Sequence, residues 1–210
     1  MIRILTNGMY LFCEWVMRLA YLNVLWIFFT LLGLGVFGVM PATVAMFAVV
    51  KKWGDGNIEE PIFKQFAKVY KEEWCKSNGL FGVICMMALI LYADVVISAT
   101  YVHSIVASLF LSVSIVYISA LLYIVPVYLH VKAGFWYMFK FCVVLAFIRP
   151  HITFFMLLSA VGFVLLGLWH ITFALFFCGS GLSLVLTKLI YFPIEEKGAN
   201  TYQQDVSRLS

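Results

Sequence analysis

The chain has 210 residues, of which 64% are hydrophobic, 18% aromatic and only 11% charged. Soluble domains carry about 25% charged residues, so ten acidic and fourteen basic side chains cannot cover a globule of this length in water. The basic residues are spread between apolar runs and form no stripe for nucleic acid. We therefore predict an all-α, polytopic helical membrane protein in a lipid bilayer, with about five transmembrane helices plus amphipathic interfacial helices.

Charge-free intervals locate the membrane crossings, because a bilayer core of about 30 Å needs about 20 helical residues. The 32 uncharged residues before Lys51 are too many for one crossing and too few for two crossings with a turn. The glycines of "GLGVFGVMP", residues 33–41, predict a break there. We expect a first span at residues 19–38 and a short second helix at 41–53, with Pro41 in its first turn.

The lysine-rich connection that follows is predicted to form an amphipathic cytoplasmic helix at residues 59–76. Its apolar face includes three candidate contacts with a partner: Phe63, Phe66 and Tyr70. Such a helix lies on the lipid surface or on the protein's own bundle; the alternative is that it docks to another cytoplasmic protein.

Two spans are expected next, at residues 79–100 and 104–130. Within the second, Ser104, Ser108 and Ser112 recur every four residues and therefore share one face of the helix. Small side chains at this spacing are typical of close helix packing, so we predict that these serines are interhelical contacts.

Residues 151–168 and 171–191 are predicted to be the last two spans of a single membrane domain, residues 1–192. Between them and the earlier spans, residues 132–148 are apolar but short, and we favour a helix that lies at the interface. The alternative is a sixth crossing. Residues 193–210 are expected to form a polar cytoplasmic tail.

Lysine and arginine residues predict the orientation, because they gather on the cytoplasmic side. With five spans, six bases in residues 51–76, three in 132–149 and three from Lys188 onward share one side. Only Arg3 and Arg18 lie on the other side. We therefore expect a cell-membrane protein with a cytoplasmic carboxyl terminus and an amino terminus outside.

Three short motifs carry a resemblance to a known family: "NVLW" at 23–26, "MPATVAMF" at 40–47 and "VVKKW" at 49–53. With the amphipathic connection, they make the chain similar to the YesL-type family of uncharacterised bacterial integral membrane proteins. In that family a Pro-Ala-Thr-x-Ala segment follows a glycine, whereas Met40 precedes Pro41 here. The resemblance implies no established activity, and it implies genes that commonly lie beside those of carbohydrate uptake and degradation systems.

Four polar residues are predicted to meet near the outer ends of the spans: Arg18, Asp94, His103 and His170. An ionised carboxylate in lipid costs about 2.5–3.5 kcal/mol, so Asp94 needs a partner, water or a proton. The cluster is either a satisfied pair that fixes helix packing or a solute or proton site. A metal site has no support from ligand spacing, and we expect no metal and no cofactor. Asn23, inside the first span, is predicted to bond to a neighbouring helix.

The sequence contains none of the common hydrolase, zinc-protease or phosphate-loop motifs, and we expect no enzyme. The favoured hypothesis is an accessory or interaction component, associated with carbohydrate uptake, that packs against a membrane transporter subunit. The alternative is a small solute carrier or channel that uses Asp94.

Overall fold

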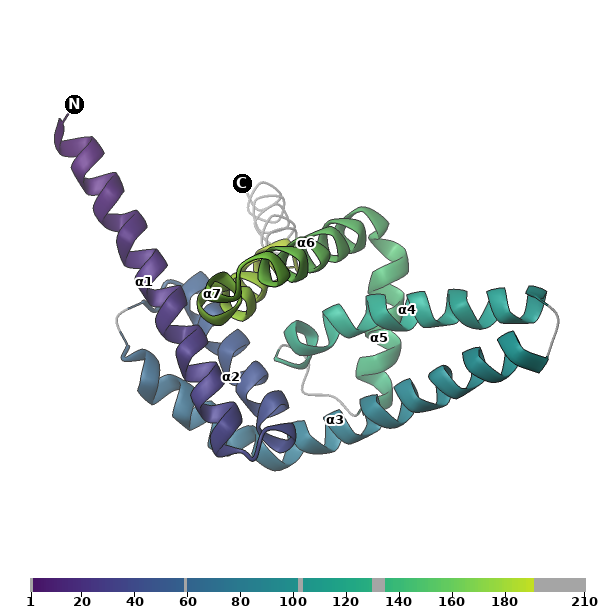
Figure 1. The fold of residues 1–210 in the computed structure, drawn as a ribbon. Helices are drawn as coiled ribbons and strands as arrows, with labels where there is room; N and C mark the ends of the chain where they lie inside the picture. Colours follow the sequence, from purple (N-terminus) through teal and green to yellow (C-terminus); the bar gives the residue numbers. More distant parts are fainter. Residues whose placement is uncertain (1, 59, 102–103, 130–134, 191–210) are drawn as a thin grey trace, which may run out of the picture.

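The computed structural model describes residues 2–58, 60–101, 104–129 and 135–190, and every regular element among them is a helix (Figure 1). In chain order these are α1 (Ile2–Leu32), α2 (Val36–Gly54), α3 (Ile62–Tyr101), α4 (Ser104–Tyr128), α5 (Phe135–Ile148), α6 (Pro150–Trp169), α7 (Ile171–Phe173) and the π-helical turn η1 (Ala174–Cys178). Residues 179–190 continue as α-helix, and we call 171–190 the last helix. Five helices, α1, α2, α3, α4 and α6, are long and apolar enough to cross a membrane. The protein is an all-α polytopic membrane protein.

α1 and α2 form an antiparallel hairpin (Figure 1). The Trp26 Nε1 donates to Thr43 Oγ1 at 3.1 Å, and the rings of Trp15 and Trp53 lie edge to face with centroids 5.7 Å apart. These pairs lie at increasing distance from the turn, as expected for antiparallel helices. α2 is therefore a full-length helix and not the short one predicted from the sequence.

The hairpin turn occupies three residues, where Leu34 and Gly35 have φ angles of 58° and 74°. α1 already ends at Leu32, so the predicted first span at 19–38 extends too far, and Pro41 lies inside α2 instead of in its first turn. The reason is a close approach between the helices. A Cβ on Gly38 would lie 2.4 Å from the carbonyl oxygen of Thr30, so α2 can begin this early only because residue 38 is glycine.

α3 is a single helix of 40 residues, where we predicted a separate amphipathic helix and a span. The polar residues between them do not break it. The Ser77 hydroxyl donates to the carbonyl oxygen of Glu73 at 2.7 Å, within the same helix. An isolated glycine such as Gly79 costs a helix only about 1 kcal/mol, which the packing of its neighbours offsets.

The later half of α3 and the first half of α4 leave the rest of the molecule as an antiparallel pair (Figure 1). Tyr117 of α4 donates to the carbonyl oxygen of Ile84 at 2.7 Å. We call the parts beyond this contact, residues 85–101 and 104–116, the arm. Apolar side chains on both of its helices are exposed, including Leu89, Ile90, Tyr92, Leu111 and Ile115.

α5 runs across the direction of α4 and α6 (Figure 1). It occupies most of the predicted interfacial segment, and its place in the membrane stays a prediction. α4 and α6 begin and end close to the predicted spans at 104–130 and 151–168.

α2 is the central helix, and each of its two faces belongs to a different core cluster. One face packs with α1 and the start of α3, through residues such as Ala45, Val49 and Phe66. The other packs with α4, α5, α6 and the last helix, through residues such as Val44 and Ile124. A helix covered on both faces can be apolar all round, as α2 is before Lys51.

Candidate functional site

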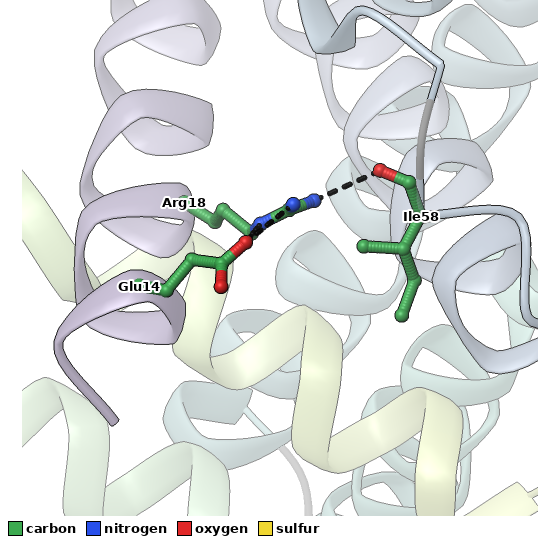
Figure 2. A network of polar contacts seen from close by, with 3 residues as sticks. All are labelled: Glu14, Arg18 and Ile58. Atoms are coloured by element: carbon green, nitrogen blue, oxygen red, sulfur yellow. Dashed lines mark hydrogen bonds and ion pairs between the residues drawn. The ribbon is translucent and has the colours of Figure 1, made fainter. Parts of the chain in front are cut away.

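Arg18 pairs with Glu14, one turn earlier on α1 (Figure 2). Its Nη2 lies 2.6 Å from Glu14 Oε1, and its Nη1 donates to the carbonyl oxygen of Ile58 at 3.0 Å. Ile58 belongs to the connection between α2 and α3, so Arg18 lies at the same end of the hairpin as the lysine-rich segment. This corrects the prediction that Arg18 lies at the opposite end, because the full-length α2 brings the chain back beside it.

Asp94 lies half-buried in the arm and has no hydrogen-bond or ion-pair partner among the residues that the structure describes. His170, after the end of α6, stacks on Trp169 with ring centroids 6.2 Å apart. His103 lies outside the described residues. Among those described, Arg18, Asp94 and His170 are not paired with one another, so the structure does not bring these three members of the predicted polar cluster together.

Asn23 joins α1 to the last helix, which confirms the prediction for this residue. Its Nδ2 donates to the carbonyl oxygen of Leu175 at 2.8 Å, and its Oδ1 accepts from the backbone N–H of Ser180 at 3.2 Å. Leu175 lies in the π-helical turn η1, and Ser180 lies two residues beyond its end, in the α-helical part of the last helix. The buried amide of Asn23 therefore bonds to one backbone carbonyl inside the π-helical turn and to one backbone N–H just after it.

Ser108 and Ser112 of α4 do not form the predicted packing face among the residues that the structure describes. Ser108 and Ser112 are exposed, and the Ser112 hydroxyl donates to the carbonyl oxygen of Leu109 at 2.7 Å. The Ser104 side chain lies outside the described residues. The packed face of α4 is further along and contains Tyr117, Ala120, Tyr123, Ile124 and Val127. Because a serine hydroxyl can bond to its own helix, the spacing alone did not identify a neighbour.

Two of the three candidate partner contacts are inside the protein's own core. Phe66 and Tyr70 are 0% and 8% exposed, whereas Phe63 is 50% exposed. The ring of Phe29 lies 5.0 Å from that of Phe66, and the Tyr70 hydroxyl donates to the carbonyl oxygen of Phe29 at 2.9 Å. The amphipathic segment therefore packs on its own bundle, which was one of the open alternatives. Phe66 and Tyr70 are corrected from partner contacts to core residues.

A cavity of about 830 Å³ lies between the end of α2, the start of α6 and the last helix. Its wall is largely apolar and includes Val50, Ile152, Phe155, Leu184 and Leu189. Its polar and aromatic residues are Trp15, Lys51, Trp53, Asp55, His151, Thr187 and Lys188. Sequence reasoning missed this site because four distant segments supply it without a motif. One feature of the sequence could have indicated the site: Lys51, His151 and Lys188 all belong to the side that was assigned to the cytoplasm.

Within the described part of the chain, no three His, Cys, Asp or Glu side chains lie close enough to hold a metal ion. The five cysteines are free thiols, and Cys142 is the buried one. The candidate sites are therefore the carboxylate of the arm, the Asn23 contact and the cavity.

Comparison with known proteins identifies the family. A family profile described as "Protein of unknown function, DUF624" matches residues 19–95. The uncharacterised protein YesL of Bacillus subtilis is 45% identical over 191 residues, which cover 91% of each chain. This chain belongs to the YesL-type family. The uncharacterised proteins YteU and YesV of Bacillus subtilis are 38% and 40% identical, covering 73% and 60% of this chain and 71% and 62% of their own lengths.

The matching family profile covers most of the α1–α2 hairpin and α3 as far as Val95. Asn23 and Asp94 both lie within it, whereas the last helix with Leu175 and Lys188 lies beyond it. No solved structure matches the chain. The function of this YesL-type protein therefore has to be argued from its own geometry.

Proposed function

We propose that the protein is a non-enzymatic accessory subunit that binds another membrane protein through its arm. The observation that carries the proposal is Asp94, a carboxylate within a membrane-crossing helix that has no partner among the described residues. Ionisable side chains inside membranes are costly and are usually paired with one another or with water. A basic side chain or a histidine on a partner helix would supply the missing interaction.

The surroundings of Asp94 support docking more than solute passage. Ile90 and Ile97, one turn to either side of Asp94 on α3, are both 55% exposed. The arm consists of two helices that leave the bundle, and two helices do not enclose a path through a membrane. Lipid or a partner's helices can cover such a surface, and the carboxylate favours a partner.

The partner that we propose is a transporter of a carbohydrate uptake system. Support for this step comes from the family resemblance, which implies gene neighbours of that kind. The contact is proposed at the arm, and no longer at Phe66 and Tyr70, because those two side chains are buried.

Photocrosslinking tests the proposal. A photoreactive residue at Ile90 should crosslink to one transporter subunit in native membranes, and Asp94→Asn should weaken that crosslink. The matched controls are a photoreactive residue at Leu34, in the hairpin turn, and Asp55→Asn, an exposed carboxylate outside the arm. An equally strong crosslink in the Asp94→Asn protein would reject the role of this carboxylate.

A second candidate function, a small carrier or channel, is favoured by the same carboxylate. Proteoliposomes that contain the purified protein alone should then take up a sugar, and Asp94→Asn should abolish the uptake. Uptake by the protein alone would reject the accessory role and support the carrier, because an accessory subunit transports nothing without its partner.

For the orientation, we propose six crossings, by α1, α2, α3, α4, α6 and the last helix, with both termini in the cytoplasm. The hairpin supports this arrangement, because the bond between Arg18 and Ile58 sets both at one end. All fourteen lysine and arginine residues then belong to the cytoplasmic side, including Arg3 and Arg18, which five crossings left outside.

A further inference from the structure

We propose that the cavity at the end of α2 binds a phosphate ester with an apolar or ring-bearing body. Residues with cationic side chains, the first residues of α6 and two residues with unpartnered polar atoms line a space of about 830 Å³. Small-molecule sites commonly measure about 300–1,000 Å³, so the space suits a ligand of this size. The proposal does not depend on Asp94 or on the arm.

The charges around the cavity favour an anion. Lys51, Lys188 and His151 line it together with a single carboxylate, Asp55. Lys51 Nζ lies 3.3 Å from the carbonyl oxygen of Leu129, and Lys188 is exposed. Two ammonium groups against one carboxylate leave a positive excess, which raises the local concentration of anions.

The amino terminus of α6 adds backbone donors to this wall. α6 begins at Pro150, and the preceding Arg149 makes no side-chain cap. The first N–H groups of a helix have no acceptor within it, and here they belong to His151 and Ile152, which both line the cavity. Such N–H groups, together with the helix dipole, are a common binding site for phosphate.

Two further polar atoms of the wall lack a partner among the described residues: Trp53 Nε1 and Thr187 Oγ1. Their residues are 5% and 6% exposed, so bulk water does not compensate the loss. A ligand with several acceptor oxygens satisfies such donors after a small shift of the wall. The edge-to-face pair of Trp15 and Trp53 provides an apolar surface for the rest of the ligand.

An anionic phospholipid headgroup and a soluble sugar phosphate share this chemistry. Basic pockets between membrane helices on the cytoplasmic side are typical sites for anionic headgroups. Both ligands would place a phosphate near the lysines and a less polar body against the wall. They differ in origin, because the phospholipid is part of the bilayer and the sugar phosphate is dissolved in water.

Mass spectrometry of the intact full-length protein in detergent tests the proposal with three probes: phosphatidylglycerol, phosphatidylcholine and glucose 6-phosphate. The variant is Lys188→Glu, which changes an exposed side chain of the cavity. The matched control is Lys64→Glu, which makes the same change at an exposed position of α3 outside the cavity. Circular dichroism verifies that both variants keep their helices.

We expect phosphatidylglycerol or glucose 6-phosphate to bind, and Lys188→Glu to weaken that binding about fivefold or more while Lys64→Glu leaves it unchanged. Selective binding of phosphatidylglycerol assigns the site to a lipid headgroup, and binding of glucose 6-phosphate assigns it to a soluble ligand. The proposal would be overturned if phosphatidylglycerol and phosphatidylcholine bound equally and glucose 6-phosphate did not bind. It would also be overturned if the Lys188→Glu and Lys64→Glu proteins bound the ligand equally.

Discussion

Asn23 on α1 donates a hydrogen bond of 2.8 Å to the carbonyl oxygen of Leu175 on the last helix, 152 residues further along the chain. The fit around this bond is tight, because a Cβ on Gly179 would lie 2.7 Å from Asn23 Oδ1. The contact joins the first and last helices at a π-helical turn. In lipid, where water cannot replace a lost bond, such a contact matters for assembly of the bundle.

Asn23→Leu should lower the free energy of unfolding by about 1–3 kcal/mol, because the carbonyl group of Leu175 and the buried N–H of Ser180 lose their partner. Thermal unfolding in detergent measures this change. Hydrogen exchange at the Ser180 amide should also become faster. Asn57→Leu, at an exposed position of the connection after α2, is the control and should change neither quantity. Unchanged exchange at Ser180 in the Asn23→Leu protein would contradict the role of the contact.

Gly38→Ala should destabilise the hairpin by about 1–3 kcal/mol, because its Cβ has no space beside Thr30. Gly82→Ala is the matched control, since a Cβ at this helical glycine meets nothing within 4 Å. The control should be neutral or stabilise the protein by up to about 1 kcal/mol. Equal stability of the two variants in a denaturant titration would show that the close approach is not required.

Phe66→Lys should prevent folding or lower stability by at least about 3 kcal/mol, because it replaces a fully buried ring with a charge. Phe63→Lys, one turn earlier and half-exposed, should stay within about 0.5 kcal/mol of the parent protein. Size-exclusion chromatography in detergent separates the two outcomes. A well-folded Phe66→Lys protein would mean that this segment detaches from the hairpin.

Single cysteines at Leu34 and Asn57 test the orientation in a protein whose native cysteines are replaced. Leu34 is 86% exposed in the hairpin turn, and Asn57 is exposed at the other end of α2. An impermeant maleimide should label Leu34→Cys in intact cells and Asn57→Cys only after permeabilisation. The reverse pattern would place the lysine-rich segment outside, against the charge distribution.

Cys142 of α5 should stay unreactive toward N-ethylmaleimide at pH 8 in the folded protein, while the exposed Cys75 is alkylated. Burial raises the pKa of the Cys142 thiol to about 12 from its ordinary value of 9.0. Between pH 9 and about 12 the Cys142 thiol therefore keeps its proton in the folded state and loses it in the unfolded state. The free energy of unfolding should fall as the pH rises above about 9. Mass spectrometry of alkylated peptides measures the labelling, and Cys142→Ser should reduce the pH dependence.

Local chemistry was enough to predict that Asn23 bonds to a neighbouring helix, because an amide in an apolar helix needs a hydrogen-bond partner wherever the helix packs. The glycine break was predictable for the same kind of reason, since Gly35 adopts a backbone conformation that other residues rarely adopt. The contact between Arg18 and Ile58 was not predictable, because it depends on how far α2 extends. The pair of Arg18 with Glu14 is a local i,i+4 contact within α1 and does not depend on α2.

The sequence alone determined that this protein lies in a lipid bilayer, that it is helical and that its positive charges are unevenly distributed. These properties follow from hydration energies that each residue contributes independently. Only the tertiary structure decided which apolar face is covered: α2 and Phe66 are buried by neighbours, whereas the arm is not. Hydrophobic spacing has the same form for a face against lipid, a partner or the protein's own helices, so the choice depends on packing between distant segments.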